Sequence, residues 1–167
     1  MLFYFRGVNV RKNISVVIVF AVALTVFSSC SQNVNAYSAM REFCTSFGIR
    51  SVIYSPIVPE GAEGYTEAGF YESLFGEKPD TVSDYAVVLL SGLDYVGECG
   101  IFVCYSSYDA LCVTEMLERR IEFIRSVSAS SGLKFPEQSF VMRENGCVVF
   151  AVLPDAEEAK RIWKHII

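Results

Sequence analysis

Few side chains of this 167-residue chain have the types and spacing that catalysis requires. A Ser-His-Asp or Cys-His site would have to use the only histidine, His165, and no G-x-S-x-G segment is present. The sequence contains no glycine-rich phosphate loop, no H-E-x-x-H pair and no EF-hand loop. It therefore predicts no catalytic residue, no cofactor and no metal site. We expect His165 at the surface, near the C-terminal end of a helix.

One acidic segment could hold a cation. "PEGAEGYTEAG" (59–69) carries Glu60, Glu63 and Glu67. Calcium sites use ligands at tighter, alternating spacing, so the pattern favours a solvated acidic loop. An enzyme would instead need a pair of carboxylates in one cleft, and we expect the protein not to be an enzyme.

Cys30 follows the longest apolar run of the chain. The segment 14–27 is an apolar or weakly polar stretch, and the residues before it include Arg6, Arg11 and Lys12. A basic region followed by an apolar region of this length is typical of an export signal. A membrane span needs about 20 apolar residues, so this run is short for one.

Three fates of this segment are open. "VFSSC" (26–30) is similar to a bacterial lipobox, in which small residues precede a cysteine that is diacylated and becomes the new N-terminus; Phe27 departs from the usual leucine-like residue. Alternatively, "VNA" (34–36) permits ordinary cleavage before Tyr37, or the run stays uncut as a signal anchor. We expect the first: a lipoprotein signal peptide at 1–29 and lipidation, such as palmitate, at Cys30. The lipid anchor would attach the chain to the outer face of the cell membrane.

The other five cysteines show no C-x-x-C spacing. They are Cys44, Cys99, Cys104, Cys112 and Cys147. An odd count cannot pair completely within one chain. Three of them lie in apolar runs, which predicts buried thiols; a single disulfide between neighbouring strands is the alternative.

The charge balance argues against nucleic acid as a partner. Residues 30–167 carry 11 basic and 19 acidic groups, a net charge of −8. Such a surface repels phosphate backbones, and no basic cluster is interleaved with aromatic residues. The expected partners are the membrane and an unknown protein or small ligand.

Residues 30–69 are predicted to form a tether, one helix and a loop. Met40, Phe43, Cys44 and Phe47 fall on one face of a helix over 37–48 that should dock on the remainder of the chain. Residues 51–58 read as a short extended piece that Pro56 interrupts.

The segment 70–167 is predicted to be an α+β domain. "YAVVLLSGL" (85–93) and "IFVCY" (101–105) form a hairpin around a turn "VGECG" (96–100). A helix capped by Asp109 follows and extends to about residue 130. Asn145-Gly146 joins a second hairpin, and Asp155 caps the last helix.

These elements predict the order β-β-α-β-β-α. We expect a four-stranded antiparallel sheet with both helices packed on one face, preceded by the N-terminal helix. "GIFVCYSSYDA" (100–110) and "GCVVFAVLPDA" (146–156) align without gaps, which fits an internal duplication. The first strand is apolar on both faces, so the second face needs a cover. The N-terminal helix is one candidate, and a partner subunit is another; in the latter case the protein would be an assembly subunit.

The order of several segments resembles a family of bacterial lipoproteins. They are "LFG" (74–76), "DYAVVLLSG" (84–92), "EMLERRIEFIRS" (115–126), "KFPEQ" (134–138) and "VMRENGCVVFAVLPD" (141–155). The domain of that family carries only an unknown-function label and is common in anaerobic Gram-positive bacteria. "GECGIFVCYSS" (97–107) departs from its pattern. The resemblance implies a lipoprotein with an α+β domain and implies no activity.

The function expected from these observations is that of a membrane-anchored extracytoplasmic lipoprotein that acts as a binding or interaction module. Tyr95, Tyr105 and Tyr108 lie around the first hairpin and the start of the long helix. Because tyrosine is enriched at interfaces, these three residues are the predicted interaction surface.

Overall fold

The computed structural model describes residues 34–90, 95–136 and 138–167. The predicted signal peptide at 1–29, Cys30 and the end of the predicted strand 85–93 lie outside the described residues. The described residues from Val34 to Ile167 form one compact unit. No helix of the described ranges is long and apolar enough to cross a membrane.

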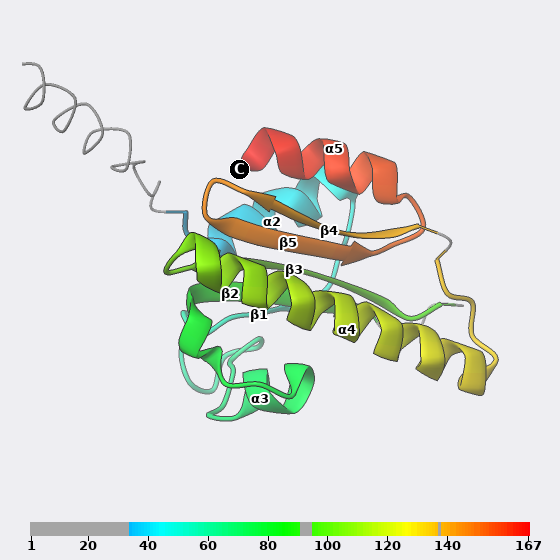
Figure 1. Cartoon of the computed structure of the whole chain (residues 1–167), viewed down its shortest axis with the longest axis horizontal. Helices are drawn as coiled ribbons and strands as arrows, with labels where there is room; N and C mark the ends of the chain where they lie inside the picture. Colours follow the sequence, from blue (N-terminus) through cyan, green and yellow to red (C-terminus); the bar gives the residue numbers. More distant parts are fainter. Residues whose placement is uncertain (1–33, 91–94, 137) are drawn as a thin grey trace, which may run out of the picture. The chain divides into compact units, whose positions relative to one another are not determined.

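The described unit is α+β, and its elements follow one another around a single sheet (Figure 1). They are α2 (Ala36–Phe47), β1 (Ile53–Tyr54), α3 (Phe70–Phe75), a 3₁₀ turn (Pro79–Thr81), β2 (Val82–Leu90), β3 (Gly97–Cys104), α4 (Ser107–Ser131), β4 (Ser139–Glu144), β5 (Cys147–Val152) and α5 (Ala156–Ile166). The sheet order is β1-β2-β3-β5-β4, and all neighbours are antiparallel.

The sheet has five strands, not the four that the sequence predicted. Both predicted hairpins form, and β3 pairs with β5 at the centre, where Ile101 lies opposite Val149. The additional strand is β1, in which Ile53 pairs with Val88 of β2. A two-residue strand is too short for its alternation to be recognised, and its pairing partner is more than 30 residues away in sequence.

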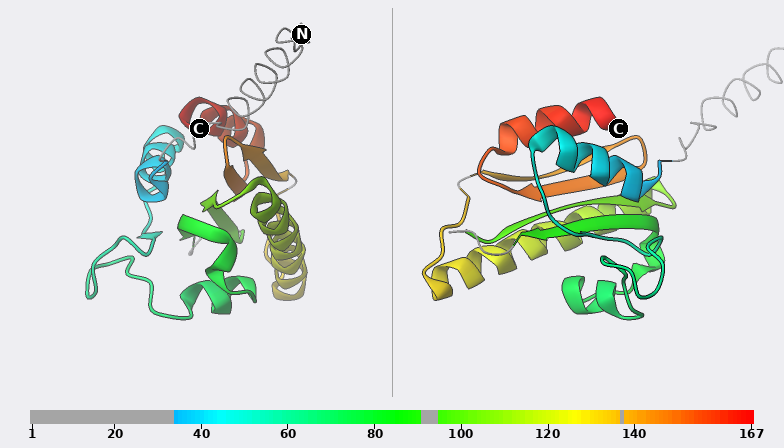
Figure 2. Two further views of the ribbon diagram at one scale, coloured as in Figure 1. Left: turned by 60° about the vertical axis from the view of Figure 1, so that its left-hand side comes forward. Right: turned by 180° about the vertical axis from the view of Figure 1, so that it is seen from behind.

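The helices cover both faces of the sheet, which corrects the prediction that they share one. Figure 2 shows α2 and α5 on one side and α4 on the other. On the first side, Phe43 of α2 and Trp163 of α5 pack over β-strand residues such as Val149. On the second, α3 and α4 pack over residues such as Phe102 and Phe150. The strands are apolar on both faces, so their sequence pattern does not indicate which face of the sheet a given helix covers.

This arrangement also bears on internal duplication. The aligned strands β3 and β5 point matching residues to matching faces, with Phe102 and Val148 both toward α4. The helices that follow them nevertheless pack on opposite faces. Superimposing the β2–β3 hairpin on the β4–β5 hairpin requires a rotation about an axis perpendicular to the sheet, and this rotation leaves each face of the sheet on its own side. A true repeat would therefore place both following helices on the same face, and the two β-β-α units do not.

The predicted turn "VGECG" belongs largely to β3. Gly97 and Gly100 are strand residues whose small size permits close packing. A Cβ on Gly100 would lie 2.7 Å from the Phe150 ring, and one on Gly97 would lie 2.9 Å from Leu90. Glycine therefore marks a close approach here and not a change of chain direction.

Helix ends follow the sequence signals, with one correction. Asn35 caps α2, and Gly48 ends it in the left-handed region. Asp155 caps α5 by accepting from the Glu158 N–H at 3.1 Å, as predicted. At α4, however, the cap is Ser106, whose hydroxyl oxygen accepts from the Asp109 N–H at 3.1 Å. The helix consequently starts three residues earlier than its acidic residue suggested.

Candidate functional site

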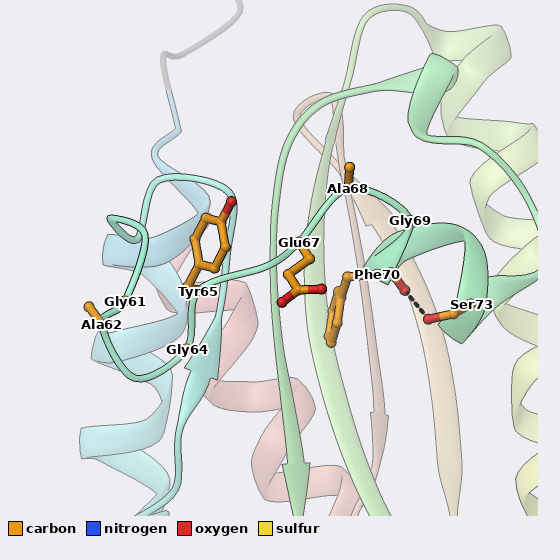
Figure 3. Close-up of a pocket in the computed structure, with 9 residues that line it drawn as sticks. All are labelled: Gly61, Ala62, Gly64, Tyr65, Glu67, Ala68, Gly69, Phe70 and Ser73. Carbon is orange, nitrogen blue, oxygen red and sulfur yellow. Dashed lines mark hydrogen bonds between the residues drawn. The ribbon is translucent and has the colours of Figure 1, made fainter.

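An open hollow of about 630 Å³ lies between the acidic loop and the start of α3. Its lining combines loop backbone with four larger polar or aromatic side chains (Figure 3). The lining residues are Gly61, Ala62, Gly64, Tyr65, Glu67, Ala68, Gly69, Phe70 and Ser73. No lysine or arginine is among them.

The loop is held against the edge of the sheet by backbone contacts. Ser55 N–H donates to the Gly64 carbonyl at 3.2 Å, and Ser55 pairs with Tyr65 in an isolated bridge. Gly64 has φ +92°, and a Cβ there would lie 2.2 Å from the Ile53 carbonyl oxygen. Only glycine allows this approach, so Gly64 fixes one wall of the hollow.

Glu67 and Phe70 provide the side chains with binding chemistry. In Figure 3 both project to the same side of the loop, whereas Tyr65 projects to the other. Glu67 is exposed, and the Phe70 ring stacks on Tyr54 with centroids 5.3 Å apart. The Ser73 hydroxyl is already engaged, since it donates to the Phe70 carbonyl at 2.8 Å. The hollow thus offers one solvated carboxylate beside an aromatic ring.

A buried ion pair positions α3 and, through it, this hollow. Glu98 of β3 is 2% exposed, and its carboxylate accepts from Arg120 of α4 at 2.7 Å (Nη2) and 3.1 Å (Nε). The remaining guanidinium nitrogen, Nη1, donates to the Leu74 carbonyl of α3 at 2.9 Å. Arg120 therefore joins β3, α4 and α3 in one contact set.

Aromatic residues and burial shape the electrostatics of this pair. The Arg120 guanidinium lies over the rings of Phe75 and Phe123, at 6.0 and 5.3 Å from their centroids. Burial raises the pKa of Glu98, and the hydrogen bonds and charge of Arg120 act against that rise. A hollow of about 280 Å³ opens beside the pair, between α3 and α4. Arg120 lines this hollow, but its guanidinium is occupied by Glu98 and by the Leu74 carbonyl, so the pair serves to hold α3 in place.

The Glu98–Arg120 pair was not predicted from the sequence. Glu98 was expected in a turn, and no role was expected for Arg120. An available signal was the helical spacing of Arg120, which falls three positions after Leu117 and four before Ile124 on the buried stripe of α4. Its partner could not be identified without knowing that β3 begins at Gly97.

The predicted interaction tyrosines are divided between two ends of β3. Tyr105 and Tyr108 lie after the last residue of the strand and are 67% and 74% exposed. Tyr95 precedes the strand, is half-buried, and forms an isolated bridge with Lys134. An eight-residue strand separates them, which is about 26 Å of chain, so Tyr95 does not share a surface with the other two.

The other predicted residues occupy the following places. Glu60, Glu63 and Glu67 are all exposed on the loop, and no group of three candidate metal ligands occurs within the described ranges. His165 is exposed in the last turn of α5. Among the cysteines, Cys44, Cys99 and Cys147 are buried, Cys104 and Cys112 are half-buried, and all five are free thiols.

Comparison of the chain with models of known families, with curated proteins and with solved structures gives no match.

Proposed function

We propose that this protein is a lipoprotein held on the outer face of the cell membrane by diacylated Cys30, and that its domain is a binding module. The observation that carries the anchor is where the folded unit begins. Val34 packs against the α2–α5 side of the core, and Asn35 caps α2. Only residues 31–33 separate this unit from Cys30. Cleavage before Cys30 leaves every described residue in place.

The competing cut before Tyr37 would damage the domain. It would remove the Asn35 side chain, which accepts from the Ser38 N–H at 2.8 Å, and a cap of this kind stabilises a helix by about 1 kcal/mol. It would also remove Ala36, which is fully buried and whose N–H donates to the Asp84 carboxylate at 2.9 Å. The new ammonium group would sit at the N-terminus of α2, where the helix dipole disfavours positive charge.

Intact mass and N-terminal sequencing of the mature protein test this assignment. We expect an N-terminal acylated Cys30 in the membrane fraction, and a Cys30→Ala chain that is exported yet carries no acyl group. A mature chain that begins at Tyr37, or membrane retention of Cys30→Ala without acylation, would contradict the lipid anchor.

The binding role rests on the hollow that Glu67 and Phe70 line. A carboxylate beside an aromatic ring, with no basic residue in the lining, suits a ligand with a positively charged group such as an amine or quaternary ammonium. The net charge of −8 outside residues 1–29 adds to that preference. Glu67 is the one carboxylate among the lining residues. A hydrolase that uses a general acid and a general base would need two such groups in the hollow. The alternative of an assembly subunit with a bare sheet face has no support, because helices cover both faces.

Titration with tetramethylammonium, choline and a lysine-containing peptide, followed by chemical shifts of loop amides, tests the binding role. We expect Glu67→Gln to abolish the shifts that wild type shows. Glu72→Gln is the matched control, since Glu72 is exposed on α3, lies outside the lining and carries the same charge. Equal loss in both variants would show a general charge effect, and no shift in wild type would contradict the proposed ligand class.

A further inference from the structure

The ends of several helices and strands lie together at one end of the folded unit. At the start of α2, Ala36 N–H donates to the carboxylate of Asp84 near the start of β2. Asp84 lies opposite Val103 near the end of β3. The following residue, Cys104, donates its N–H to the Gly146 carbonyl in the β4–β5 turn at 3.0 Å. The first residue of the unit and the start of α4 therefore lie at the same end, as Figure 1 shows.

This end exposes a cluster of large apolar side chains. Six large apolar residues of the described ranges are exposed, and three of them, Tyr105, Tyr108 and Leu111, fall within seven residues of each other here. Tyr108 and Leu111 are three positions apart on α4, so their side chains are neighbours on the helix surface. We call these three residues the tyrosine end.

The chain before the unit is too short to place this end far from the lipid anchor. Four Cα–Cα steps separate Cys30 from Val34, and even fully extended they span at most about 14 Å. The polar layer of one bilayer leaflet is itself about 5–8 Å thick. α4, in contrast, has 25 residues and is about 37 Å long, so its far end is beyond the reach of the anchor.

We propose that the tyrosine end docks on the lipid surface to which Cys30 is attached, with Tyr105, Tyr108 and Leu111 in the headgroup layer. This inference rests on the lipid anchor proposed above. Tyrosine is enriched at that level of membrane proteins because its ring is apolar and its hydroxyl stays hydrated. The docking fixes the orientation of the domain, so that the C-terminal end of α4 points away from the membrane.

The contact depends on the tether and on apolar area, and charge contributes little to it. Residues 30–167 have a net charge of −8, which repels anionic lipid. Asp109, which follows Tyr108 in the chain, accepts a hydrogen bond from the Ser106 hydroxyl at 2.6 Å. The docking should therefore persist at high salt, unlike the binding of a basic surface patch.

Quenching by lipids that carry a nitroxide on the headgroup tests the orientation. The mature lipidated protein, purified from membranes, is reconstituted in vesicles of phosphatidylcholine and phosphatidylglycerol. Tyr108→Trp places a probe at the tyrosine end, and Leu133→Trp places one past the C-terminal end of α4 at another exposed position. Wild type provides the baseline, since its only tryptophan, Trp163, is fully buried. Circular dichroism confirms that each variant is folded.

We expect strong loss of the added fluorescence in Tyr108→Trp, with or without 0.5 M salt (about a 4–5 Å Debye length), and no loss in Leu133→Trp. Equal quenching of the two probes would show a domain lying along the membrane, and no quenching of either would show one that stands clear; each result overturns the docking. The mass of Cys30 is read in the same samples. An unacylated Cys30 refutes the anchor and the docking together, whereas an acylated Cys30 with an unquenched Tyr108→Trp probe refutes only the docking.

Discussion

Replacing Arg120 by alanine should remove much of the stability of the domain. Arg120 is 16% exposed and is the partner of a Glu98 carboxylate that is 3% exposed. Its loss leaves that carboxylate buried without its partner and frees the Leu74 carbonyl of α3. Breaking a buried pair in this way typically destabilises a protein by about 3–5 kcal/mol, because one charge remains desolvated.

The neighbouring arginine is a matched control. Arg119 pairs with Glu77, and its side chain is 62% exposed. Exposed ion pairs contribute about 0–1 kcal/mol, so Arg119→Ala should hardly change the free energy of unfolding. Replacing both members of the buried pair, as in Glu98→Leu with Arg120→Met, should recover most of the loss, because no unpaired charge remains.

Urea denaturation followed by circular dichroism and Trp163 fluorescence measures these differences. The pH dependence gives a second test. In Arg120→Ala the groups that lower the Glu98 pKa are gone, so burial raises it further above its unfolded value. The folded state then binds more protons than the unfolded state between the two pKa values, and stability increases as the pH falls through that window. The defect of Arg120→Ala relative to wild type should therefore shrink toward acid pH. An Arg120→Ala defect no larger than that of Arg119→Ala, or one that does not change with pH, would refute this account of the pair.

Two further predictions concern the α2–α5 side of the core. Phe43→Ala should destabilise the domain by about 3–5 kcal/mol and change Trp163 emission, because the Phe43 and Trp163 rings stack with centroids 4.4 Å apart. Phe47→Ala, at a half-buried position, should lower the free energy of unfolding less in the same urea assay. Burial raises the pKa of Cys44 to about 11, which lowers its thiolate fraction at pH 8. Alkylation by iodoacetamide at that pH, followed by mass spectrometry, should be on the order of 100-fold slower in the folded protein than after unfolding. Rapid labelling of Cys44 in the folded state would contradict the docking of α2.

The candidate site was only partly predictable. The acidic loop was recognised from its glycine, proline and glutamate content, and Glu67 was named within it. That Glu67 and Phe70 line one hollow depends on β1, which brings the loop to the sheet edge through the Ser55 and Gly64 backbone. The grouping of Tyr105 with Tyr108, and the separation of Tyr95, depends on which end of β3 each tyrosine occupies.

The sequence by itself determined what short-range interactions control. The 3.6-residue period of α2 and α5, the turn at Asn145-Gly146, the cap at Asp155 and the apolar strands each involve residues close together in the chain. Only the tertiary structure decided the face of each helix, the fifth strand, and the burial of Glu98. Strands that are apolar on both faces do not indicate on which face of the sheet the following helix packs. The pairing of Glu98 with Arg120 joins residues 22 apart in sequence, and no local pattern encodes a contact that forms only when α4 packs on the sheet.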